Sequence, residues 1–223
     1  YSSVFDEIRL YDDILTPQEI EAEYLRHTAK VSASAFPHRA NVPIRRSEVK
    51  IDGNVSPGEW DHATQIPLNK EFFTGELVPE KSFLSFQHDR DKVYFLFETD
   101  AFAQSPAVKS FERSMKAFGH DVFEVILRSG KAASHTAPFI QIGISPGGFW
   151  AMQNGGNWKE KTNLNFAVSC TEGTTRIEAA IPIREVDPSF HDGKSWQAEF
   201  GYTVHSNPAI SSAQDRIRAW VHV

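Results

Sequence analysis

From Glu48 to the C-terminus the chain is a succession of short apolar or alternating segments, each closed by turn residues. The segment Val93-Tyr94-Phe95-Leu96-Phe97 is continuously apolar, so both faces of that strand are expected to be covered. Short strands at this spacing, without a sustained helical period, are typical of a sandwich. We therefore predict an all-β fold, an antiparallel β-sandwich of jelly-roll or immunoglobulin-like type, over residues 48–223.

The alternation locates the individual strands. We expect them at residues 83–88, 93–99, 122–128, 139–145, 148–153, 164–169, 175–181, 197–204 and 216–223. A helical turn is expected within residues 182–190. The 17 phenylalanines agree with this assignment, because Phe packs well on a pleated surface.

The beginning of the chain has a different organisation. Residues 4–11 largely alternate and predict a strand, and Thr16-Pro17 with Glu19 forms a capping box that predicts a helix. One strand and one helix are too small to fold alone. We therefore divide the chain into an N-terminal remnant (1–27), a linker without a sustained period (28–47) and the sandwich (48–223).

The charge balance limits the partners. The net charge is −6, and nucleic acids and anionic membranes both favour a basic surface, so neither is expected as a partner. The sequence contains no apolar run long enough to insert into a membrane.

The residues do not predict an enzyme. No nucleophile elbow, zinc-protease, phosphate-loop or dinucleotide motif is present, and no spacing selects a pair of carboxylates. His120-Asp121 fits the entrance of a strand better than a metal or acid–base pair. Cys170, the one cysteine, fits a small buried hydrophobe and excludes an internal disulfide.

Alternation also sorts the strand residues into two faces. Along residues 122–128, Phe123, Val125 and Leu127 belong to the core, and Glu124 and Arg128 lie opposite. In the other strands the positions opposite the core carry mainly planar polar groups: Gln141, Arg176, Glu178, Gln197, Glu199, Arg216 and Arg218, with Trp220 and His222 in the last strand. Such groups suit sugar hydroxyls, but a polar outer face also commonly only meets water.

Six segments, taken in order, resemble the family 9 carbohydrate-binding modules, within the wider group of DOMON-like sandwiches. They are Ile51-Asp52-Gly53 with residues 59–63, then 91–96, 121–127, 139–142, 178–182 and 196–200. The resemblance covers residues 48–223 and implies a carbohydrate-binding β-sandwich.

The resemblance also implies where a sugar would bind. Members of the family hold a sugar between two tryptophans. Phe118 occupies the first of these positions, Glu124 matches a polar contact, and Gln141 matches a second. The loop that carries the second tryptophan has no aromatic residue here, and Trp150, Trp158 or Trp220 could replace it.

The expected ligand-binding residues are Phe118, Glu124, Gln141, Arg218, Trp220 and Trp158. Trp60 and Trp196 match positions with a packing role. The resemblance implies no catalytic residue and no cofactor, although calcium could brace a loop as in relatives.

The N-terminal remnant resembles the final strand and helix of a laminin-G-like, concanavalin-type domain. This implies a larger secreted or cell-surface bacterial protein whose other domains act on or bind glycans, with an oligo- or polysaccharide as partner. Two alternatives remain open: a structural or docking sandwich without sugar affinity, and a haem-binding DOMON-like domain in which Met115 or Met152 pairs with a histidine.

Overall fold

The computed structural model describes residues 42–70, 77–102, 120–129, 139–154, 157–159, 163–186, 196–205 and 217–222. The chain divides into two compact units, Tyr1–Pro37 and His38–Val223, and every described residue belongs to the second. The predicted N-terminal strand and helix, and the first part of the predicted linker, lie outside the described residues.

The described elements are strands apart from one short helix. The strands are β1 (Thr64–Pro67), β2 (Ser82–His88), β3 (Lys92–Thr99), β4 (Val122–Ser129), β5 (Phe139–Ile144), β6 (Trp150–Asn154), β7 (Asn157–Trp158), β8 (Asn165–Thr171), β9 (Thr174–Pro182), β10 (Trp196–Thr203) and β11 (Ile217–His222). The helix is α2 (Ile183–Val186), within the stretch where a helical turn was expected.

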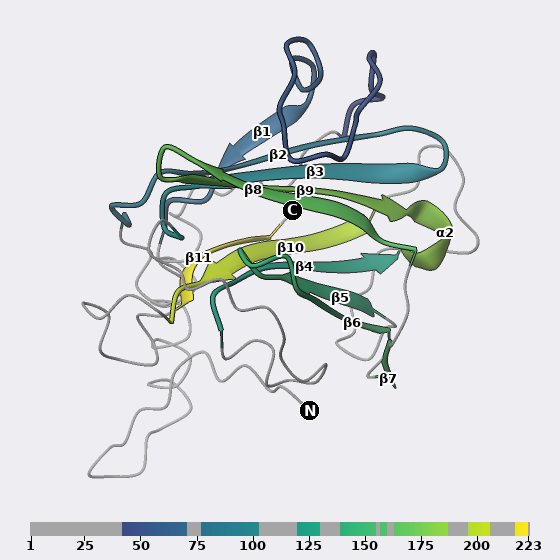
Figure 1. The fold of residues 1–223 in the computed structure, drawn as a ribbon. Coiled ribbons are helices and arrows are strands. Elements are labelled where there is room, and N and C mark those ends of the chain that lie inside the picture. Colours follow the sequence, from purple (N-terminus) through teal and green to yellow (C-terminus); the bar gives the residue numbers. More distant parts are fainter. Residues whose placement is uncertain are drawn as a thin grey trace, which may run out of the picture. The chain divides into compact units, whose positions relative to one another are not determined.

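These strands form two sheets. The first has the order β1-β2-β3-β9-β8 and the second the order β11-β10-β4-β5-β6-β7. Every pairing between neighbouring strands is antiparallel. The sheets lie in two layers (Figure 1), so the predicted antiparallel β-sandwich is confirmed.

Aromatic side chains join the two layers. Phe97 of β3 stacks on Phe123 of β4 with ring centroids 4.4 Å apart and planes 10° from parallel. Phe95, two residues before Phe97, contacts Phe200 of β10 at 5.5 Å. These rings are almost completely buried. Alternation along β3 and β4 therefore places these phenylalanines between the sheets, where aromatic contacts add to the burial of apolar area.

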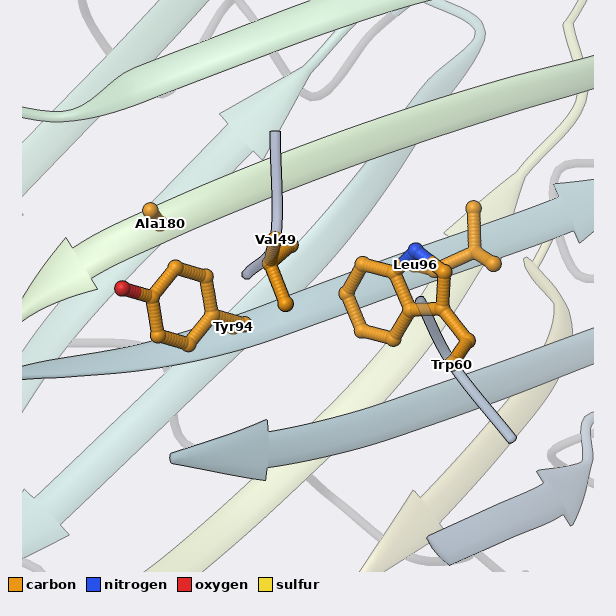
Figure 2. Packing of buried hydrophobic residues seen from close by; sticks show 5 residues of the cluster. All are labelled: Val49, Trp60, Tyr94, Leu96 and Ala180. Atoms are coloured by element: carbon orange, nitrogen blue, oxygen red, sulfur yellow. The ribbon is translucent and has the colours of Figure 1, made fainter. Parts of the chain in front are cut away.

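A second apolar cluster covers the outer face of the first sheet. It consists of Val49, Trp60, Tyr94, Leu96 and Ala180, all buried (Figure 2). The strand residues Tyr94 and Leu96 alternate with the inward-facing phenylalanines of β3, so the segment that carries Val49 and Trp60 packs on the other side of the sheet. This confirms that both faces of the apolar run are covered and that Trp60 has a packing role.

A buried carboxylate fixes that covering segment to the sheet. Glu178 of β9 is fully buried, and its Oε2 accepts hydrogen bonds from the backbone N–H groups of Gly53 (2.7 Å) and Asp52 (3.2 Å). Its Oε1 accepts a bond from Trp60 Nε1 at 3.3 Å. Burial raises the pKa of Glu178, although the bonds from the turn oppose this. The segments Ile51-Asp52-Gly53 and 178–182 thus have a structural role here.

Two details of the sequence interpretation differ from the structure. The short strands β1 and β7 were not predicted. Cys170 was expected to be buried, and this is wrong because its side chain is exposed. It lies one residue before the end of β8, an edge strand of the first sheet, where a neighbouring strand covers one side only.

Candidate functional site

The candidate site lies on the outer face of the second sheet, and β4 sets which residues reach that face. Phe123, Val125 and Leu127 are almost completely buried on the inner side. Because successive side chains of a strand point to opposite faces, Glu124 and Arg128 belong to the outer face, as predicted.

Glu124 lies between two glycines. Its register partners are Gly143 of β5 and Gly201 of β10, and Gly201 is in turn opposite Trp220 of β11. Residues paired in this way share one face of the sheet. The carboxylate of Glu124 is therefore flanked on both sides by positions that carry no side chain.

The adjacent row of the same face carries two amides. Gln141 of β5 is opposite Gln153 of β6, and Gln153 is opposite Trp158 of β7. Gln153 Nε2 donates a hydrogen bond to Gln141 Oε1, and Gln141 Nε2 donates one to Glu124 Oε1. We call these three residues the amide relay. All three are buried, with exposed fractions of 6%, 8% and 6% for Glu124, Gln141 and Gln153.

The surroundings of Glu124 favour its neutral form. Burial raises its pKa from 4.5 to about 7, and the negative charge of Glu199 on β10 adds to the rise, while the hydrogen bond from Gln141 opposes it. Near neutral pH the protonated and ionised forms of Glu124 are therefore both populated.

A cation lies on the same face beside the amide relay. Arg128 donates through Nη1 to Glu199 Oε1, and its guanidinium lies 5.5 Å from the centre of the Phe139 ring. Because Glu199 is opposite Ile126, which precedes Arg128 by two residues, this ion pair occupies the next part of the polar face. The guanidinium of Arg128 thus forms an ion pair with Glu199 and a cation–π contact with the Phe139 ring.

The structure brings together some of the predicted site residues. Glu124 and Gln141 are hydrogen-bonded, and Trp158 ends the row of Gln141. Trp220 shares the row of Glu124, and Arg218 lies two residues earlier in β11; of β11 the structure describes the backbone register alone. Phe118 lies outside the described residues.

Sequence reasoning missed Gln153. The strand that contains it was predicted, and it is a polar residue next to the buried Met152, so alternation would have assigned it to the outer face. The missing information was the register that places Gln153 opposite Gln141.

Other kinds of site find less support among the described residues. No group of three or more His, Cys, Asp or Glu in this part of the chain could hold a metal ion. Met152, one of the haem-ligand alternatives, is buried opposite Ile142 on the inner side of the sheet. His120 and Asp121 directly precede β4, as expected for a strand entrance. No described helix is long and apolar enough to cross a membrane.

Comparison with known proteins reveals similarity at the level of structure. No family model and no curated protein sequence matches the chain. A family 9 carbohydrate-binding module from Caldicellulosiruptor kristjanssonii, solved with cellotriose, is similar with a TM-score of 0.53 and 13% identity, over 81% of this chain and 82% of that chain. The structure of such a module solved with glucose gives 0.50 and 12%, over 81% and 84%.

A candidate carbohydrate-binding protein from Bacteroides uniformis is similar with a TM-score of 0.56 and 10% identity, over 81% of this chain and 87% of that chain. At these identities the similarity establishes a shared β-sandwich fold. It does not by itself establish a shared ligand, because one fold supports many functions.

Proposed function

We propose that the sandwich is a non-catalytic carbohydrate-binding module of family 9 type, within the DOMON-like group, that binds an oligo- or polysaccharide on the outer face of its second sheet. The observation that carries the proposal is the hydrogen-bonded pair of Glu124 and Gln141, on a fold shared with modules solved with cellotriose and glucose.

The chemistry of the pair suits a sugar. A carboxylate oxygen accepts hydrogen bonds from hydroxyls, and an amide N–H donates to them, so the two groups together match neighbouring hydroxyls of a pyranose ring. Trp158 and Trp220, at the ends of the two adjacent rows, are the residues that we propose as stacking partners, with Phe118 and Arg218 as further contacts.

The context of the module belongs to the same proposal. We place it in a larger secreted or cell-surface protein, preceded by the end of a laminin-G-like domain at residues 1–27 and a linker at 28–47. No cofactor is needed for binding, and any calcium ion would have a structural role only.

A glycan array, followed by calorimetric titration with cellotriose and glucose, tests this function. At pH 8, where Glu124 is ionised, Glu124→Gln keeps the shape of the side chain and removes its charge, and we expect it to weaken binding roughly tenfold or more, since bonds to a charged group are the stronger ones. Glu98→Gln is the matched control, because Glu98 pairs with Arg176 on the other sheet. Failure of the wild-type protein to bind any glycan would refute the proposal.

One observation favours a second candidate function. Glu124, Gln141 and Gln153 are all more than nine-tenths buried, as expected if they stabilise a structural sandwich rather than contact a sugar. In that case the wild-type protein would bind no glycan.

A further inference from the structure

The amide relay has a direction. Gln153 donates to the carbonyl oxygen of Gln141, which leaves the amino group of Gln141 directed at Glu124. If the Gln141 amide were turned over, its carbonyl oxygen would face the carboxylate, and its amino group would face the amino group of Gln153. When Glu124 is ionised both contacts would be repulsive, because an ionised carboxylate only accepts and an amino group only donates.

Gln153 therefore supports this direction by donating to the carbonyl oxygen of Gln141, while the ionised carboxylate of Glu124 accepts from its amino group. It does not contact Glu124 directly in the described hydrogen bonds, and it acts through Gln141. In a buried network each bond strengthens the next, so loss of the outer bond weakens the inner one.

The amide relay leaves one hydrogen-bond acceptor and one donor for a ligand. One N–H of Gln141 is used by Glu124, and the second makes no hydrogen bond to another described residue. Among the described residues, no donor reaches the Oε2 oxygen of Glu124. The site thus offers one fixed acceptor beside one fixed donor.

The charged residues around this pattern have both signs. Glu124 and Glu199 lie on neighbouring strands, and Arg128, the described cation near them, is engaged by Glu199. In β11, His222 is opposite Glu199 and Arg218 is in the same strand as Trp220. Above pH 7, where Glu124 is ionised, an anionic group placed against it would meet a like charge in a partly water-excluded place, where repulsion is strong.

We propose that Gln153 is a positioning residue that orients Gln141, so that the site selects adjacent hydroxyls of an uncharged sugar and rejects uronic acids. This inference rests on the proposed function and specifies its ligand class.

The first experiment needs no ligand. Glutamate-selective ¹³C labelling, with the signal assigned from its loss in Glu124→Gln, reports the titration of the Glu124 carboxyl by NMR. Gln153→Met keeps the side-chain length and removes the donor, and we expect the Glu124 midpoint to rise by roughly 0.5 to 1 pH unit. Gln153→Glu supplies an acceptor that turns Gln141 over, and we expect a larger rise.

Gln65→Met is the control, because Gln65 donates to Ser85 in the first sheet at 3.3 Å and lies outside the relay. It should leave the Glu124 midpoint unchanged. An unchanged midpoint in both Gln153 variants would overturn the positioning role, whatever the protein binds.

The second experiment measures binding at pH 8 to cellotriose, mannotriose and trigalacturonate. We expect at least one neutral trimer to bind at least tenfold more tightly than trigalacturonate, and Gln153→Met to weaken that binding roughly 3- to 10-fold. Equal or tighter binding of trigalacturonate would overturn the ligand class while leaving a carbohydrate-binding function intact. Absence of binding to every glycan would overturn the ligand class together with the proposed function.

Discussion

Replacing Glu124 by glutamine should change how the stability of the protein depends on pH. The pKa of Glu124 is raised by burial from 4.5 to about 7 in the folded protein, whereas the unfolded chain retains the ordinary value. Between these two values the folded state holds a proton that the unfolded state has released. The free energy of unfolding therefore falls as pH rises from about 4.5 to about 7, and then levels off.

The size of this effect follows from the separation of the two values. Each pH unit corresponds to about 1.36 kcal/mol, so ionised Glu124 lowers the free energy of unfolding by up to about 3 kcal/mol above pH 7. Glutamine has the same shape, accepts the bond from Gln141 and does not titrate. The stability of Glu124→Gln relative to the wild type should consequently increase by about 3 kcal/mol from pH 4.5 to pH 8.

Urea denaturation of both proteins at half-unit steps of pH measures this difference. Groups that titrate in both proteins cancel in the subtraction, so the curve reports Glu124 and its coupling to Glu199. A difference that stays constant from pH 4.5 to pH 8 would refute the reasoning, because it would mean that Glu124 keeps its ordinary pKa in the folded protein.

Three further substitutions test the segment that covers the first sheet and its neighbouring turn. Gly53 and Gly58 have φ angles of +83° and +84°, but a Cβ at Gly53 would lie 3.3 Å from Ser169 Cβ, whereas none lies within 4 Å at Gly58. Gly53→Ala should thus lower the free energy of unfolding, measured by urea denaturation, by about 1 kcal/mol more than Gly58→Ala does. Equal losses would contradict a close contact between the new Cβ and Ser169. Burial tends to raise the pKa of Asp89, but hydrogen bonds led by that from the Tyr94 hydroxyl lower it to about 2. The stability that Asp89 contributes should be complete above pH 4 and lost toward pH 2, so wild type and Asp89→Asn should converge in acid-denaturation curves.

The sandwich could be predicted from the sequence because its signal is local. Alternation along β4 and the continuous apolar run of β3 each follow from which sides of one strand are buried. The two strands that were missed, β1 and β7, are short and carry too few residues to show a period. The exposure of Cys170 depends on β8 being an edge strand, and strand order is a property of the whole sheet.

The candidate site was only partly predictable for the same reason. Glu124 and Gln141 were identified from a family resemblance, and the structure joins them by a hydrogen bond. Gln153 belongs with them only because β5 and β6 pair in one register, and the turn between them, closed by the bond from Ser145 N to Phe149 O (2.8 Å), determines that register. A shift by one residue would turn Gln153 to the inner face.

Two buried glutamates show why residue type alone cannot separate a binding group from a structural one. Glu178 and Glu124 both lie on the outer face of a sheet, and burial raises the pKa of each. Both oxygens of Glu178 accept bonds from groups whose positions are fixed by the fold, two backbone N–H groups and the indole of Trp60. Glu124 accepts one bond from a side-chain amide among the described residues, and that amide needs Gln153 to hold it in place. A carboxylate with unused acceptor capacity gains the most from a partner that brings donors, and for this reason we assign ligand binding to Glu124 and structural support to Glu178.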